Sequence, residues 1–227
     1  MPTALVTGAN RGIGLELVRQ YATDGYRVHA CCRTPQEADD LKAIPGDVSI
    51  HKLDVTNHGA IDTLASEIGE PIDVLIANAG VYGPGSEGQT FGSLDYDGLR
   101  NTFETNTLGA LKTCEAFAPH VARSSERKMV AITSQMGSID DASGGSTAYR
   151  VSKTALNMAM AVAASEMKSQ DVSVAVVHPG WVQTAMGGPN GNVTPQDSAM
   201  GIKKVIAGLR PAAKAPFLTY SGSELAW

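Results

Sequence analysis

The segment ALVTGANRGIG, residues 4–14, decides how this chain folds. A short apolar run at 4–7 is typical of a buried strand. It leads into Gly8, Gly12 and Gly14, and an amphipathic helical pattern follows. Glycines let the backbone turn tightly and approach a pyrophosphate, to which the helix N-terminus presents unpaired N–H groups. The segment therefore predicts the phosphate-binding turn of a βαβ unit, although glycines alone would also fit a simple tight turn.

The rest of the chain repeats this alternation of apolar, β-branched runs with longer Ala-, Leu- and Met-rich stretches, which is typical of βαβ units on a parallel sheet. Helices are expected to begin near Arg11, Glu37, Ala60, Asp97, Tyr149 and Thr194. Seven runs are expected to be strands: 4–7, 27–32, 49–53, 73–77, 128–134, 173–178 and 216–220. We therefore expect a single domain over residues 1–227, of the α/β class, with a Rossmann-type doubly wound parallel sheet of about seven strands and helices on both faces.

Composition excludes several classes of protein. A hydrophobic share of 43% excludes intrinsic disorder, and a net charge of −5 offers no cationic surface to nucleic acid or membrane. Apolar runs are too short to span a bilayer, and the N-terminus lacks the pattern of a secretory signal, so we expect a cytoplasmic protein. Cys31, Cys32 and Cys114 show no metal-ligand spacing, which favours buried, reduced thiols and no metal site.

The end of the second predicted strand bears on the choice of cofactor. Where an NAD-binding fingerprint places an acid for the ribose 2′-hydroxyl, this chain has Cys31-Cys32-Arg33. The planar guanidinium of Arg33, helped by Arg11, could pair with a 2′-phosphate. The sequence thus favours NADP(H), with NAD(H) still possible. The alternative is that Arg33 is a solvated surface residue.

Four signatures in order resemble the short-chain dehydrogenase/reductase family over nearly the whole chain. They are TGANRGIG at 7–14, NAG at 78–80, Ser134 with YRVSK at 149–153, and Pro179-Gly180; Ala77 replaces the first Asn of the usual NNAG. SQMGSI at 134–139, YRVSKTALNM at 149–158 and the aromatic ending 225–227 resemble the small carbonyl reductases of the C-factor and sniffer-like branch. The resemblance implies reversible hydride transfer between NAD(P) and a small carbonyl or alcohol substrate, in a homodimer or homotetramer.

Four residues are expected to be catalytic. Tyr149 and Lys153 are four residues apart and share one helix face, where the ammonium could stabilise the phenolate and make Tyr149 a general acid or base. Ser134 follows an apolar strand and could donate to the substrate oxygen, or merely cap a turn. The resemblance assigns Asn106 to holding a water that links Lys153 to solvent; the alternative is a buried amide that packs the helix.

The glycine turn and the resemblance together assign cofactor binding to the carboxyl ends of the strands. Two assignments have structural alternatives: Asp54 could only cap the next helix, and Asn78 could only stabilise the sheet. His178 is interpreted as structural. The predicted cofactor-binding residues are Gly8, Asn10, Arg11, Gly12, Ile13, Gly14, Arg33, Asp54, Val55, Asn78, Ala79, Gly80, Tyr149, Lys153, Pro179, Gly180, Val182 and Thr184.

Two predicted helices, at 97–117 and 149–163, are apolar on more than one stripe, so we expect them also to form a subunit interface unless loops cover them. An apolar ketone or aldehyde is the expected substrate, in a pocket lined by Gln135, Met136, Ser143, Trp181 and Met186. The sequence predicts NADPH-dependent carbonyl reduction. The alternatives are a C-factor-type signalling or scaffold protein that binds NADP(H), and an NAD-linked alcohol dehydrogenase.

Overall fold

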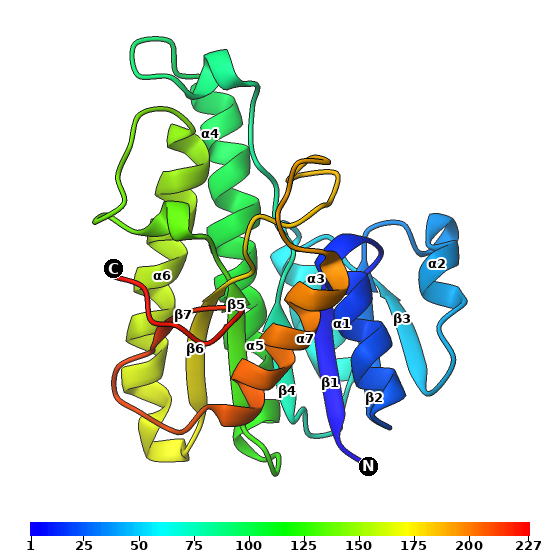
Figure 1. The fold of residues 1–227 in the computed structure, drawn as a ribbon. Coiled ribbons are helices and arrows are strands. Elements are labelled where there is room, and N and C mark those ends of the chain that lie inside the picture. Colours follow the sequence, from blue (N-terminus) through cyan, green and yellow to red (C-terminus); the bar gives the residue numbers. More distant parts are fainter.

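Seven parallel strands form one sheet in the order β3-β2-β1-β4-β5-β6-β7 in the computed structural model, which describes residues 1–227 (Figure 1). All but the edge strands β3 and β7 are almost wholly buried, as two-sided helical cover requires. The strands are β1 Thr3–Thr7, β2 Arg27–Cys32, β3 Val48–Lys52, β4 Val74–Ala77, β5 Lys128–Ile132, β6 Ser173–His178 and β7 Phe217–Thr219. The predicted fold class is confirmed.

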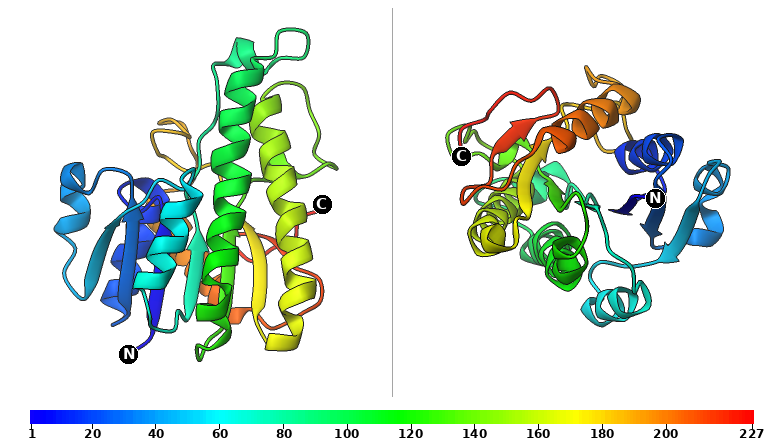
Figure 2. Two further views of the ribbon diagram at one scale, coloured as in Figure 1. Left: turned by 180° about the vertical axis from the view of Figure 1, so that it is seen from behind. Right: turned by 90° about the horizontal axis from the view of Figure 1, so that it is seen from below.

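Helices cover both faces of the sheet and enclose two apolar cores. The α1, α2 and α7 helices cover one face, and α3, α5 and α6 cover the other; both layers are visible in the two views of Figure 2. The α-helices are α1 Gly12–Thr23, α2 Asp39–Lys42, α3 His58–Glu67, α4 Tyr96–Phe103, α5 Gly109–Ala122, α6 Thr147–Met167 and α7 Pro195–Gly208. Short 3-10 turns are η1 Pro35–Glu37, η2 Ser86–Gln89, η4 Gln135–Gly137 and η5 Lys168–Gln170.

Element boundaries lie within about two residues of those expected, with two informative exceptions. The helix expected from Asp97 contains a π-helical turn, η3 Glu104–Leu108, between α4 and α5. Strand β5 ends at Ile132, so Ser134 lies beyond the strand rather than in it. The predicted cap of α7 is confirmed, because Thr194 Oγ1 accepts a hydrogen bond from Asp197 N at 3.1 Å and Pro195 occupies the first turn.

Some apolar side chains of α6 do not pack into the core and lie at the surface. Leu156 and Met160 are buried in the core, whereas Met158 is 66% exposed and Val162 is 48% exposed. No loop covers Met158 or Val162, which excludes that alternative for these two residues. The α4–η3–α5 rod runs beside α6 and extends past the sheet (Figure 2).

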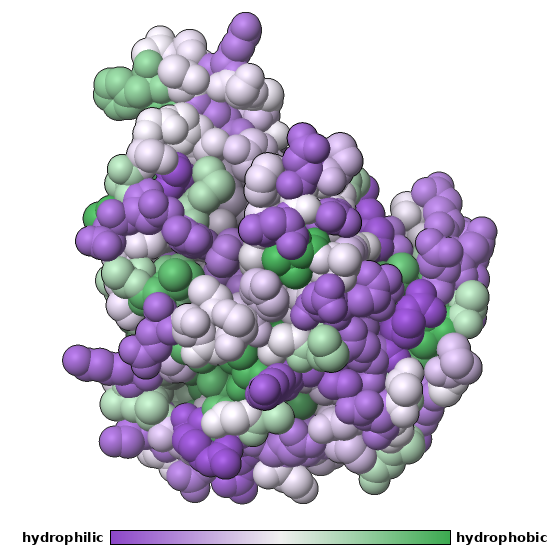
Figure 3. Space-filling view, viewed as in Figure 1, coloured by the Kyte–Doolittle hydropathy of each residue, from purple (hydrophilic) through white to green (hydrophobic).

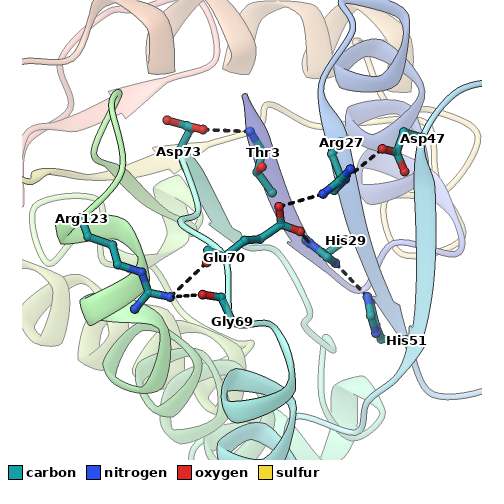
Figure 4. Close-up of polar contacts among 9 residues, drawn as sticks. All are labelled: Thr3, Arg27, His29, Asp47, His51, Gly69, Glu70, Asp73 and Arg123. Carbon is teal, nitrogen blue, oxygen red and sulfur yellow. Dashed lines mark hydrogen bonds and ion pairs between the residues drawn. The ribbon is translucent and has the colours of Figure 1, made fainter. Parts of the chain in front are cut away.

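An ion-pair network ties together the amino ends of the strands (Figure 4). Arg27 pairs with Asp47 at 2.8 Å and with Glu70 at 2.9 Å. Glu70 also bonds His29 at 3.0 Å, and the other ring nitrogen of His29 bonds His51 at 2.9 Å. These residues come from β2 and β3 and from the segments before β3 and β4, so the network ties this edge of the sheet together.

The buried carboxylate of Asp73 joins two further segments at the same end. It accepts hydrogen bonds from the backbone N–H groups of Thr3, Ser125 and Glu126 at 2.9–3.1 Å. The first strand is thereby tied to the turn before β5.

The three cysteine side chains are buried, as expected, and burial raises the pKa of each thiol.

No helix of the structure combines the length and hydrophobicity that crossing a bilayer demands. Hydrophobic residues on the face shown in Figure 3 form small patches separated by hydrophilic surface.

Candidate active site

A cavity of about 730 Å³ opens at the carboxyl ends of the strands. It lies beside β1, where the chain crosses from β3 to β4 and the direction in which strands are added to the sheet reverses. Open α/β sheets bind ligands at this position. Fifteen residues predicted to bind the cofactor line it: Gly8, Asn10, Arg11, Gly12, Ile13, Arg33, Asp54, Val55, Asn78, Ala79, Gly80, Tyr149, Lys153, Pro179 and Thr184.

The glycines of the turn after β1 have distinct roles. Gly8 and Gly12 adopt φ of +65° and +56°, which disfavours any side chain, and both line the cavity. Gly14 does not line it. A Cβ on Gly14 would lie 2.2 Å from the carbonyl oxygen of Gly8, so Gly14 lets the helix pack against the turn.

Two arginines give the cavity a positive end. Arg11 and Arg33 are exposed, line the cavity, and form no ion pair or side-chain hydrogen bond. Asp54 lies near Arg33. Burial alone would raise the pKa of Asp54, but hydrogen bonds from Thr56 and the charge of Arg33 lower it overall. Asn57, not Asp54, caps α3.

Asn78 holds the sheet together at the site, which supports its structural alternative. Its side-chain Nδ2 donates to the carbonyl oxygens of Thr7 at 2.9 Å and Gly8 at 3.2 Å, and its backbone N–H donates to Thr7 Oγ1. Asn78 thereby fixes the glycine turn to the end of β4 while it lines the cavity.

Tyr149 and Lys153 project from one face of α6 into the cavity, as their spacing predicts. Lys153 Nζ lies 5.8 Å from the centroid of the Tyr149 ring and donates to the Ile132 carbonyl at 2.9 Å. Burial lowers the pKa of Lys153 to about 8. Burial also raises the pKa of Tyr149 to about 12, against a lowering by the Ser134 hydrogen bond. Burial is therefore the main influence on the pKa of Tyr149 here, and Lys153 is not among the groups that shift it.

Ser134 is both a turn cap and a partner of Tyr149. Its Oγ accepts from Met136 N at 3.1 Å, and it lies close enough to the Tyr149 side chain to lower the pKa of the phenol. The neighbouring Thr133 hydroxyl instead donates to Asn157 Oδ1 at 2.6 Å, so it is no rival for this role. Ser134 itself is buried and does not line the cavity.

Asn106 lies in the π-helical turn η3, a kind of turn frequent at functional sites. Its amide is fully buried: Oδ1 accepts from Val81 N, and Nδ2 donates to the Val81 carbonyl and to Ser152 Oγ, at 2.8–3.0 Å. Lys153 lies nearby, because a Cβ on Gly80 would be 3.2 Å from Asn106 Oδ1 and 3.5 Å from Lys153 Nζ. These bonds fit a buried packing amide, and Asn106 also lies close to Lys153, behind the cavity wall.

Two further predicted cofactor residues also lie outside the cavity lining. Gly180 has φ of +86°, and a Cβ there would lie 3.0 Å from the Tyr220 ring, so it serves packing. Val182 is buried and bridges to Val193, while Pro179 and Thr184 line the cavity.

Several lining residues were missed. Asn101, Glu104 and Thr105 reach the cavity from α4 and η3. Their i, i+3, i+4 spacing could have indicated one polar helix face, but no motif marked it. The other missed residues are Cys32, Leu53, Thr56, Val81, Ile132, Thr133, Gln183, Ala185 and Pro195.

Of the expected substrate-pocket residues, only Met186 lines this cavity. Trp181 is 54% exposed, and its Nε1 donates to the Gly187 carbonyl at 2.7 Å. Ser143 is held by the guanidinium of Arg150. Gln135 and Met136 lie in η4 and also stay outside the lining. These residues lie in loops and a short 3-10 turn, whose paths a sequence pattern does not determine.

Comparison with known proteins agrees with this geometry. The family model described as "short chain dehydrogenase" matches residues 2–193. The "C-signal" protein of Myxococcus xanthus is 40% identical over 158 residues, which cover 69% of this chain and 93% of that protein.

Two solved structures resemble the whole chain. The carbonyl reductase Sniffer of D. melanogaster is 29% identical with a TM-score of 0.91, and the match covers 100% of both chains. The NADPH-bound carbonyl reductase from chicken fatty liver is 30% identical with a TM-score of 0.89, covering 100% of this chain and 99% of that one. These likenesses confirm the predicted C-factor and sniffer-like branch. The chain belongs to the short-chain dehydrogenase/reductase family of oxidoreductases.

Proposed function

We propose that this protein reduces a small ketone or aldehyde with NADPH, and oxidises the alcohol in the reverse direction, with Tyr149 as the general acid or base. The observation that carries the proposal is that Tyr149 and Lys153 line the same cavity as the glycine turn, with Ser134 near enough to lower the pKa of Tyr149. A proton donor thus lies beside a surface suited to a dinucleotide.

The residues present fit NADP(H). The Cβ-free surface of Gly8 and Gly12 leaves room for a pyrophosphate at the N-terminus of α1. The unpaired guanidinium groups of Arg11 and Arg33 would hold a 2′-phosphate. The NADPH-bound structure of a relative supports the same choice.

Each side chain has a role that follows from its environment. With a pKa of about 12, Tyr149 keeps its proton at neutral pH and can give it to a carbonyl oxygen. Ser134 lowers the pKa of Tyr149 and so eases that proton's release. With a pKa of about 8, Lys153 can exchange a proton near neutral pH, close to the buried Asn106 amide. The bound cofactor would supply the hydride.

Fluorescence titration with NADPH and NADH, on wild type and Arg33→Ala, tests the proposal when ketone turnover is recorded in the same samples. We expect tighter binding of NADPH, loss of about tenfold in that preference with Arg33→Ala, and consumption of cofactor by ketones. Equal binding of NADH would refute the role of Arg33 and leave the NAD-linked dehydrogenase. Binding without turnover would refute the reductase.

A second candidate function is a signalling or scaffold protein controlled by NADP(H) occupancy. The 40% identity to C-signal favours it, whereas the complete set of Ser134, Tyr149, Lys153 and Asn106 favours an enzyme, since binding alone needs no proton donor. Comparing the cellular effect of Tyr149→Phe with that of wild type separates the two. An effect that survives loss of turnover would support signalling.

We also propose that α5 and α6 form the interface of a homodimer, alone or within a homotetramer. The exposed Met158 and Val162 on α6, with Leu108 at the start of α5, would be covered in it. Sedimentation of Met158→Glu should show dissociation. A wild-type monomer would refute the interface.

A further inference from the structure

Gln89, in the loop between β4 and α4, has a fully buried side chain. Its Oε1 accepts a hydrogen bond from the backbone N–H of Tyr149 at 3.1 Å. Its Nε2 donates to the carbonyl oxygens of Pro84 at 2.8 Å and Tyr82 at 3.3 Å. One buried amide therefore joins residues 82–89 to the backbone of the proposed proton donor.

The start of α6 lacks the usual local cap. Ser146 precedes the helix in the left-handed region, with φ of 54°, and its side chain makes no capping bond. The first N–H groups of a helix have no partner within it. The Tyr149 N–H belongs to this set, being the third of α6, and Gln89 satisfies it from 60 residues away in the sequence. The conformation of the loop is thereby coupled to the first turn of the helix.

The same loop also touches the Tyr149 side chain. The rings of Tyr82 and Tyr149 pack with centroids 4.9 Å apart, and the Tyr82 hydroxyl bonds that of Ser146. The loop begins at Val81, which lines the cavity and is held on both its backbone N–H and carbonyl by Asn106. The segment 81–89 thus runs from the cavity wall to the back of Tyr149.

We propose that Gln89 is a positioning residue for Tyr149, which sets the place of the phenol in the cavity by fixing its backbone, with Tyr82 holding the ring. This inference rests on the proposed reductase function. Small displacements of a reacting group carry large kinetic costs, up to about a hundredfold for 1 Å. Loss of the Gln89 amide frees the first turn of α6 and lets water reach the phenol.

The test compares Gln89→Met, which keeps the length of the side chain but cannot cap, with Gln89→Glu, which keeps the acceptor for the Tyr149 N–H. We expect kcat for ketone reduction to fall about tenfold in Gln89→Met, with the Kd for NADPH changed less than about twofold. Hydrogen exchange of the Tyr149 amide should accelerate at least about tenfold. Gln89→Glu should retain more activity than Gln89→Met.

The pH profile separates positioning from loss of folded protein. A hydrated Tyr149 has a pKa nearer its ordinary value of about 10, so the alkaline limb of kcat/KM should move to lower pH in Gln89→Met. A smaller folded fraction would lower the rate without moving that limb. The matched control is Thr90→Val, which removes a hydrogen bond to Ser86 within the same loop and touches no part of Tyr149.

Wild-type kcat and an unmoved limb in folded Gln89→Met would overturn the proposal. If that variant does not fold, Gln89→Glu decides: it keeps the acceptor for the Tyr149 N–H but loses both donors to Pro84 and Tyr82, so a kcat equal to wild type would overturn the proposal, and a lowered kcat with unchanged Kd for NADPH would support it. A wild type that binds NADPH and reduces no carbonyl is a different outcome, because it refutes the proposed function.

Discussion

At the amino ends of the strands Arg27 bonds both Asp47 and Glu70, whereas at the carboxyl ends Arg11 and Arg33 have no acidic partner. The Asp73 carboxylate at the amino ends accepts three backbone hydrogen bonds, and at the carboxyl ends the buried Nδ1 of His178 has no partner; the buried Nδ1 of His120, near the end of α5, also has none.

This difference indicates which groups stabilise the fold and which remain free to interact with a ligand. Paired groups at the amino ends have their interactions satisfied and contribute to stability. Tyr149 and Lys153 at the carboxyl ends line the cavity and have pKa values displaced by burial, a combination typical of functional sites; burial also shifts the pKa values of Tyr26 and Lys128 at the amino ends, which lie outside the cavity. Substitutions at the two ends should therefore separate activity from stability.

Tyr149→Phe is expected to have the largest effect. Removing the proton donor should lower kcat for ketone reduction about 10³-fold, with NADPH affinity and melting temperature nearly unchanged. Steady-state kinetics and thermal unfolding measure both. The matched control is Tyr26→Phe at the amino ends, where the hydroxyl donates to Glu126 at 2.6 Å; it should lose stability and keep turnover. Equal turnover losses in both variants would contradict the contrast.

Asp73→Ala should lower stability and leave turnover unchanged, which is the opposite of the effect expected for Tyr149→Phe. It leaves three backbone N–H groups without an acceptor, so we expect the free energy of unfolding to fall by about 3 kcal/mol while folded protein keeps its kcat. Urea denaturation measures the change. Asp54→Ala, beside the cavity, is the comparison and should cost less than about 1 kcal/mol, because its bonds go only to Thr56. A larger loss of unfolding free energy in Asp54→Ala would contradict the expected difference between the two ends of the sheet.

His178, at the carboxyl end of β6, should make the stability of the protein depend on pH. Burial lowers its pKa to about 4, below the unfolded value of about 6.5. The unfolded state therefore binds more protons between these values, and stability falls as pH falls through this range. His178→Asn should reduce the drop between pH 7 and 4.5 by about 2 kcal/mol, measured by urea denaturation. His51, whose pKa burial and His29 also lower, keeps part of the slope. An unchanged slope would mean that His178 titrates normally.

Glu70→Gln should have the smallest effect. Both Arg27 and Glu70 are partly exposed, and pairs of this kind contribute about 1 kcal/mol or less. We expect a loss of that size in unfolding free energy, reduced further at high salt, and no change in turnover. A loss above about 3 kcal/mol would show that His29 and His51 make the network cooperative.

The sheet, the glycine turn and the Tyr149–Lys153 pair could all be predicted from the order of residues alone. Apolar runs that must be buried on two sides leave few alternatives to a parallel sheet, and a spacing of four residues on a helix leaves one face. Residues next to strand ends, such as Arg33 and Asn78, were also found, because the carboxyl ends of parallel strands meet at one edge.

The folded arrangement determines which of these groups meet and how far their pKa values shift. Burial, which depends on the whole fold, raises the pKa of Tyr149 where spacing to Lys153 had predicted a lowering. The loops place Trp181 against the Gly187 carbonyl and Ser143 against Arg150, outside the cavity lining. The bond from Gln89 to Tyr149 joins residues 60 apart through an irregular loop, and no periodicity in the sequence encodes a contact of that kind.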